Sequence, residues 1–243
     1  MNRFKAFGIH LAISLAIFFV LAYFVVFEWY PGFFFDTDGG WRGMRIIVAV
    51  DLVLGPLLTL VVYKHGKPGL KMDLALIGIF QFVCLFAGTW IVYSERPLSV
   101  VYVDGRFSVL SADEYTDAGL RPPPLNEFPG DDPKWVMVVV PQGLEAEADF
   151  RAQAIGRGSL NVAIDHYQAF DAEHPAFTDN ALDLDIVRQR ADGGAALNEW
   201  INEHGGTLDD YAFYLFTTRY AYKYAGFKQG NEQMIGFLDV KPR

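Results

Sequence analysis

Cysteine and basic residues are scarce in this chain. Cys84 is the only cysteine among 243 residues, so an intramolecular disulfide framework and cysteine-rich zinc sites are excluded. Only 20 residues are Lys or Arg against 29 that are Asp or Glu, which leaves no domain-wide basic surface to neutralise phosphates. The sequence also has no internal repeat and no low-complexity segment. We therefore expect no nucleic-acid partner, and the classes that stay open are membrane proteins, enzymes and interaction proteins.

Three long apolar runs occupy the first part of the chain. Residues 8–27 and 74–93 hold no charged side chain, and residues 44–63 form a run of the same length. About twenty apolar residues in a helix that rises about 1.5 Å per residue match the thickness of a bilayer core. A signal peptide is the alternative for the first run, but the bulky stretch from Tyr23 to Tyr30 offers no small-residue cleavage site. The sequence thus predicts three transmembrane helices, the first of them an uncleaved anchor.

The charges flanking these runs predict an orientation. Arg3 and Lys5 precede the first run, and the short loop 64–71 between the second and third runs carries three lysines. The positive-inside rule therefore places the N-terminus and this loop in the cytoplasm. Residues 97–243 contain 23 acidic and 12 basic residues, a net charge of −11, whereas residues 1–96 carry +2. We expect a membrane protein whose acidic second part, residues 97–243, is extracytoplasmic.

The second part predicts an α+β domain with a largely antiparallel sheet. Asp104-Gly105 lies between two β-rich runs, and this dipeptide is typical of a type I′ hairpin turn. Residues 135–140 form a short apolar run between prolines, which indicates a buried strand. The remaining patterns predict helices over 144–155, 182–190 and 195–203 and strands over 211–218, 220–224 and 233–240. The predicted fold class is a membrane protein with three transmembrane α-helices followed by this extracytoplasmic domain.

Asp51 is the residue in the apolar runs that a bilayer makes most costly. A charged side chain well inside the hydrocarbon region costs about a few kcal/mol or more unless it is paired, protonated or hydrated. Counting from Met44 places it in the outer half of the second span, where Thr89 of the third span could reach it. Two interpretations stay open: a structural Asp within the bundle, or a contact with a polar group of a partner in the membrane.

Gly55 and Pro56 follow Asp51 on the same span. Proline lacks a backbone donor and clashes with the preceding turn, while glycine permits close helix approach. We expect the helix to be interrupted here, either to shape a groove for a partner helix or for packing of the bundle alone. Thr59 and Gln81 are polar residues in span interiors, and we expect them to form hydrogen bonds between helices.

The aromatic residues near the C-terminal end suggest a second surface for a partner. Residues 211–216 are apolar on both strand faces, which is typical of a central strand buried on both sides. Tyr220, Tyr222 and Tyr224 alternate along the next run, and tyrosine is enriched at protein interfaces. The alternatives are a second buried strand or an exposed recognition strip made of these three tyrosines.

The chain shows no credible catalytic constellation. His166 and His174 lie near acidic residues, but no short-spaced pair of ligands on one helix face supports a metal. Asp183 and Asp185 lack the preceding apolar strand that would present a nucleophilic carboxylate, so helix-surface acids are the better interpretation. We expect no enzyme, no cofactor and no metal. A membrane-anchored periplasmic hydrolase that uses these two carboxylates is the alternative.

Several loop and span motifs are dense over residues 1–97 and are specific in combination. They comprise Arg3-Phe-Lys-Ala-Phe7, His10-Leu11, Trp29-Tyr-Pro-Gly32, Val50-Asp-Leu-Val-Leu-Gly-Pro-Leu-Leu-Thr59, Gly66-Lys-Pro-Gly-Leu-Lys71, Glu95-Arg-Pro97 and, at the end, Gly236-Phe-Leu-Asp-Val-Lys-Pro242. Together these motifs resemble the TfpX/TfpZ family of type IV pilin accessory proteins.

The resemblance implies an inner-membrane accessory protein, chaperone-like or modulating assembly, without enzymatic activity. Its partner would be a type IV major pilin, with other pilus assembly components as further partners and the lipid bilayer around its spans. The candidate partner-binding residues are Asp51, Gly55 and Pro56 in the second span and Tyr220, Tyr222 and Tyr224 in the outer domain.

Overall fold

The computed structural model describes residues 2–240 and divides the chain into two compact units, of which the first ends at Arg96 and the second begins at Pro97. The last residues of the terminal motif, 241–243, lie outside the described residues. Residues 2–96 make up the first unit, and residues 97–240 make up the second unit.

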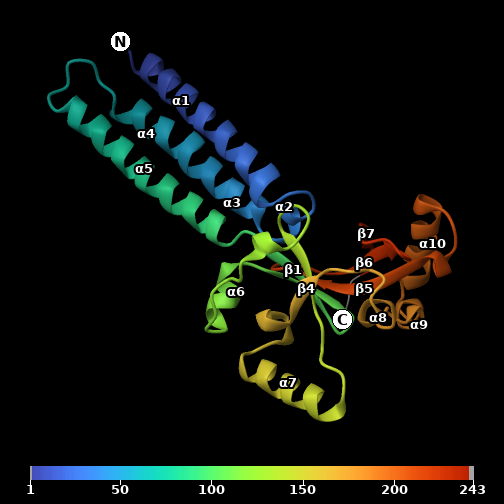
Figure 1. Cartoon of the computed structure of the whole chain (residues 1–243). Helices are drawn as coiled ribbons and strands as arrows, with labels where there is room; N and C mark the ends of the chain where they lie inside the picture. The colour runs from blue at the N-terminus through green and yellow to red at the C-terminus, as the bar shows by residue number, and fades with distance from the viewer. Residues whose placement is uncertain (1, 241–243) are drawn as a thin grey trace. The chain divides into compact units, whose positions relative to one another are not determined.

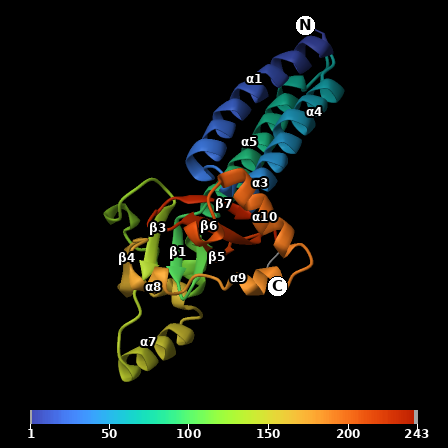
Figure 2. The same cartoon turned by 90° about the vertical axis from the view of Figure 1, so that its right-hand side faces the viewer.

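The first unit is made of helices. Figures 1 and 2 both show α1, α4 and α5 lying side by side. Three continuous helical segments, Arg3–Trp29, Gly40–Val62 and Leu70–Ser94, have 27, 23 and 25 residues and are long and apolar enough to cross a membrane. The elements in chain order are α1 (Arg3–Tyr23), the π-helical η1 (Phe24–Trp29), α2 (Phe34–Thr37), α3 (Gly40–Ile47), the π-helical η2 (Val48–Leu54), α4 (Gly55–Val62) and α5 (Leu70–Ser94).

The three predicted spans are confirmed as helices, and each begins several residues earlier than the apolar run alone indicates. The expected interruption at Gly55 and Pro56 takes the form of η2, which immediately precedes them. Pro56 has no N–H to donate and its ring crowds the turn before it. The wider π-helical turns accommodate such a break in the hydrogen-bond ladder, and the second span continues through it to Val62.

The second unit is an α+β domain. Its first half contains β1 (Ser99–Val103), β2 (Arg106–Leu110), α6 (Ala112–Asp117), η3 (Leu125–Glu127), β3 (Lys134–Val138), α7 (Leu144–Gly156), η4 (Leu160–Val162), η5 (Ile164–His166) and β4 (Tyr167–Ala169). Its second half contains α8 (Pro175–Thr178), α9 (Leu184–Arg188), α10 (Gly193–His204), η6 (Leu208–Asp210), β5 (Tyr211–Thr217), β6 (Tyr222–Lys228) and β7 (Met234–Leu238). The helix predicted over 182–190 is shorter than expected, because Asp183 caps its N-terminus by accepting a hydrogen bond from the Asp185 backbone N–H.

All seven strands form one sheet in the order β4-β3-β1-β2-β5-β6-β7. Four neighbouring pairs are antiparallel, but β1 pairs with β3 and β2 with β5 in parallel. The sheet is therefore mostly antiparallel, as predicted, and mixed at its centre, which the sequence did not indicate. The predicted hairpin is confirmed: Asp104 and Gly105 have φ angles of 48° and 74°, the positive values that a type I′ turn requires.

Strand β5 is buried on both faces, as its sequence predicts. On one face Phe213 belongs to an apolar cluster with Trp200 of α10 and Leu238 of β7, and Figure 2 shows α10 beside β6 and β7. On the other face, Tyr214 and Phe216 join aromatic rings from β1, β2, β6 and α8. A separate cluster around β1 and β3, covered in part by α7, completes the core of the second unit.

Candidate functional site

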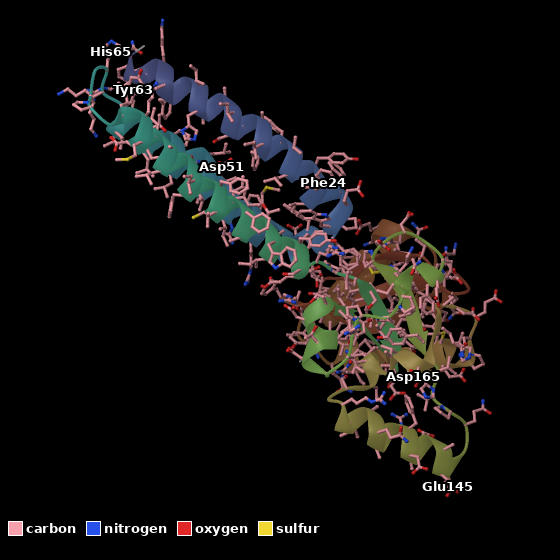
Figure 3. The ribbon with its side chains drawn as sticks, turned by 60° about the vertical axis from the view of Figure 1, so that its left-hand side comes forward. Phe24, Asp51, Tyr63, His65, Glu145 and Asp165 are labelled. Carbon is pink, nitrogen blue, oxygen red and sulfur yellow. The ribbon has the colours of Figure 1, made fainter. Side chains whose placement is uncertain are left out.

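A buried polar cluster lies inside the three-helix bundle of the first unit. Figure 3 shows Asp51 about midway along the bundle, between Tyr63 near one end and Phe24 near the other. The Asp51 side chain is buried, with 4% of its surface exposed, and Ser14 of α1 and Gln81 of α5 are buried with it. One residue from each of the three spans therefore meets at this point.

Two hydrogen bonds converge on one carboxylate oxygen. Ser14 Oγ donates to Asp51 Oδ1 over 3.3 Å, and Gln81 Nε2 donates to the same oxygen over 3.1 Å and to the Asp51 backbone oxygen over 3.4 Å. Among the atoms of residues 2–240, no hydrogen-bond partner of Asp51 Oδ2 is found. A second contact between the first and second spans joins His10 Nδ1 to Thr59 Oγ1 over 2.6 Å. The cluster thus ties the first span to the second at two levels, and the second span to the third at one.

Helical spacing explains why these residues meet. His10 and Ser14 are four residues apart on α1, and Asp51, Gly55 and Thr59 recur at the same interval on the second span. Side chains at i and i+4 lie on one face of a helix, so each set forms a stripe. The residues in both stripes are small or polar, which allows apolar helices to approach closely and to form hydrogen bonds between them.

Gly55 makes the contact with the third span possible. A Cβ atom on Gly55 would lie 1.9 Å from Gln81 Nε2 and 2.2 Å from Gln81 Cδ, far inside van der Waals contact. Only glycine leaves room for the Gln81 amide to pass the second span and reach Asp51. Pro56 is buried next to it.

The prediction that Thr89 reaches Asp51 was wrong. Thr89 forms no hydrogen bond with Asp51, and the Thr89 hydroxyl is buried without a hydrogen-bond partner within the described part of the chain. Gln81 takes that place, and the prediction that Gln81 and Thr59 form hydrogen bonds between helices is confirmed. Sequence reasoning missed Ser14 and His10 as members of the cluster. Their spacing of four residues within an otherwise apolar span is the signal that could have found them.

The structure corrects the expectation of an exposed strip of three tyrosines. Tyr220 and Tyr222 are exposed to 43% and 66%, but Tyr224 is buried at 4% within the cluster beneath α10. Its hydroxyl accepts a hydrogen bond from Arg190 Nη2 over 3.1 Å, and the guanidinium carbon of Arg190 lies 5.7 Å from the ring centroid. Only the first two tyrosines are available to a partner on this surface.

Three of the residues considered for catalysis or metal binding in the second unit have structural contacts that account for them. Asp183 caps α9, and Asp185 accepts a hydrogen bond from Arg188 Nη1 over 2.8 Å on the exposed surface. His174 caps α8 through its ring, since Nδ1 accepts from the Ala176 backbone N–H. Within residues 2–240 no group of three or more His, Cys, Asp or Glu side chains is arranged to hold a metal ion.

Three helices of membrane-crossing length, joined by a polar cluster and followed by an α+β unit, are consistent with a membrane protein. Comparison with known proteins gives the family. Residues 1–34 match the family described as Fimbrial assembly protein FimB. The chain is 32% identical over 110 residues to the fimbrial assembly protein of serogroups C1 and C2 of Dichelobacter nodosus. This match covers 44% of this chain and 83% of the Dichelobacter protein.

The chain belongs to this family of fimbrial assembly proteins. The serogroup I protein of Dichelobacter nodosus is 34% identical to it over 110 residues, and the serogroup E1 protein is 31% identical over the same length. Each match covers 44% of this chain, and the chain spans only 42% of the length of these two relatives. No solved structure gives a significant match.

Proposed function

We propose that this chain is an inner-membrane accessory protein of the TfpX/TfpZ type that assists assembly of type IV fimbriae by binding a major pilin, without catalysing a reaction. One observation supports the proposal above the others, namely the similarity of the chain to fimbrial assembly proteins. Three helices of membrane-crossing length fit the same role, since a pilin awaiting assembly is held in the membrane by an apolar helix.

The proposed orientation follows from charge. Arg3, Lys5 and the lysines of the loop 64–71 mark one end of the bundle, which we assign to the cytoplasm. Three crossings then put the second unit in the periplasm, where its net charge of −11 over residues 97–243 keeps it soluble and steers basic partners toward it.

The proposed pilin contacts differ between the two sets of candidate residues. Asp51 and Gly55 lie where the second span meets the first and third spans, and Pro56 is buried beside them, so a pilin helix reaches these residues only where the spans separate. First contact in the membrane therefore falls to outward-facing apolar side chains such as Val61, which is 77% exposed. In the second unit, Tyr222 is the corresponding exposed candidate. In this proposal the buried cluster fixes the bundle that presents these outer faces.

Site-specific photocrosslinking in cells tests the proposal. A photoreactive phenylalanine derivative replaces Val61 or Tyr222, and the matched control places it at Thr59, which is buried on the same helix as Val61. We expect an adduct with the major pilin from Val61 and from Tyr222 and none from Thr59. The proposed pilin binding would be wrong if neither exposed position gave a pilin adduct while the chain was present at its normal level.

A further inference from the structure

The second span carries a hollow on its surface that the proposed role in fimbrial assembly does not use. The hollow has a volume of about 510 Å³ and is lined by Arg42, Arg45, Ile46, Ala49 and Val50. These positions follow one another at intervals of three and one residues along α3 and the start of η2, so they lie on one face of the helix.

The opposite face of the same segment packs inside the first unit. Gly43, Met44 and Ile47 are buried, and a Cβ on Gly43 would lie 2.4 Å from a methyl group of Val92 on α5. The face with the hollow therefore points away from α5. Ile46 and Ala49 on it are exposed.

Charge is concentrated at one end of the hollow. Arg42 and Arg45 lie within the first two turns of the 23-residue helix that begins at Gly40, which is the depth at which a spanning helix meets the headgroups. Both arginines are exposed, and within the described residues no carboxylate pairs with Arg45. Its guanidinium carbon lies 5.8 Å from the ring centroid of Trp41, an exposed aromatic side chain of the kind found at membrane interfaces.

We propose that this face binds an anionic phospholipid, with its phosphodiester bound by Arg45 and the start of one acyl chain lying along Ile46, Ala49 and Val50. Guanidinium groups match phosphate oxygens in geometry and charge, and they are the preferred phosphate ligands in proteins. A headgroup of net negative charge suits this basic end of the face better than a zwitterionic headgroup, whose own ammonium competes for the phosphate. The proposal rests on the helices lying in a bilayer and not on the fimbrial role.

Lipid retention by the purified full chain tests the site. The chain is reconstituted in nanodiscs with equal amounts of phosphatidylglycerol and phosphatidylethanolamine, then released into detergent and analysed by native mass spectrometry. We expect phosphatidylglycerol to be enriched on the wild-type chain. Arg45→Gln should lower its retention about five-fold, because one basic residue near the membrane surface contributes a factor of this order. Arg45→Lys keeps the charge and should retain most of the binding.

The control is Lys228→Gln, which removes an exposed positive charge from β6 of the second unit. It should leave retention unchanged. Equal retention of the two lipids by the wild-type chain would overturn the proposal, as would Arg45→Gln binding like wild type or Lys228→Gln losing as much as Arg45→Gln. Displacement of the lipid by inorganic phosphate at millimolar concentration would also overturn it, because the acyl chain would then contribute nothing. Circular dichroism of each variant confirms that the helices are intact.

Discussion

Replacement of Gly55 by alanine is the sharpest test of the buried cluster. The three atoms closest to the added methyl group all belong to the Gln81 amide, at 1.9, 2.2 and 2.5 Å, so Gln81 must swing away and stop donating to Asp51. Hydrogen bonds between membrane helices contribute on average about 0.6 kcal/mol and at most about 1.7 kcal/mol. We therefore expect Gly55→Ala to lower the free energy of unfolding by about this amount relative to a matched control.

Gly78→Ala on α5 is the matched control, since a Cβ at Gly78 meets no atom within 4 Å. Both changes bring the same gain in helix propensity, about 1 kcal/mol for alanine over glycine, so the difference between them isolates the Gln81 contact. The assay is unfolding of the full chain in mixed micelles by sodium dodecyl sulfate, followed by circular dichroism. In a Gln81→Ala background the penalty of Gly55→Ala should vanish, because no amide is left to displace. Equal stability of Gly55→Ala and Gly78→Ala, or a penalty that persists without Gln81, would refute the reasoning.

Three further predictions concern the carboxylate, the core of the second unit and its buried tyrosines. Asp51→Asn keeps the shape of the side chain, so it should reduce surface fimbriae without lowering the level of the chain; unchanged fimbriation would remove the carboxylate from the function. Gly226→Ala places a Cβ 2.5 Å from the ring of Trp200 and should lower the free energy of unfolding by about 1–3 kcal/mol in thermal unfolding. The control Gly194→Ala adds a Cβ that meets no atom within 4 Å and should cost no stability. Equal melting temperatures of the two variants would contradict this packing. Burial raises the pKa of four tyrosines, whose hydroxyls stay neutral in the folded chain. In the unfolded chain they ionise near pH 10, so their contribution to stability is complete below about pH 10. Above that pH the free energy of unfolding falls by up to about 1.4 kcal/mol per pH unit for each tyrosine. They are Tyr102, Tyr115, Tyr167 and Tyr214. Tyrosinate absorbance of the folded chain should show these four ionising only with unfolding, and reversible ionisation of all tyrosines near pH 10 would disprove it.

The features that the sequence predicted well depend on local chemistry. An apolar run of about twenty residues matches the thickness of a bilayer core, and the three spans predicted from such runs are helices in the structure. The dipeptide Asp104-Gly105 sets its own turn because both residues tolerate positive φ angles. The apolar character of both faces of residues 211–216 identified a central strand, and β5 indeed lies between β2 and β6.

The features that the sequence did not predict depend on how distant segments meet. The parallel pairing of β2 with β5 joins residues about a hundred positions apart, and no turn residue indicates it. Thr89 was expected near Asp51 because depth was counted from Met44, whereas the helix begins at Gly40. Four residues at about 1.5 Å each move Asp51 roughly 6 Å deeper, which accounts for about half of the distance along α5 from Thr89 to Gln81.

The burial of Tyr224 also escaped the sequence. Alternation along β6 puts Tyr222 and Tyr224 on one face, but only the second of them lies beneath α10, whose position depends on tertiary packing. The same limit applies to the buried cluster, because the rotation of α1 that brings Ser14 to Asp51 is set by packing of the three helices together.

The central claim is that this chain assists fimbrial assembly from within a membrane. The most direct measurement deletes its gene in a bacterium that carries it together with type IV fimbriae, and quantifies sheared surface pilin and total pilin. Complementation is compared between the full chain and residues 97–243 exported without the first unit. The account predicts that surface fimbriae fall on deletion and return only with the full chain. Wild-type fimbriation in the deletion strain, or full rescue by residues 97–243 alone, would contradict it.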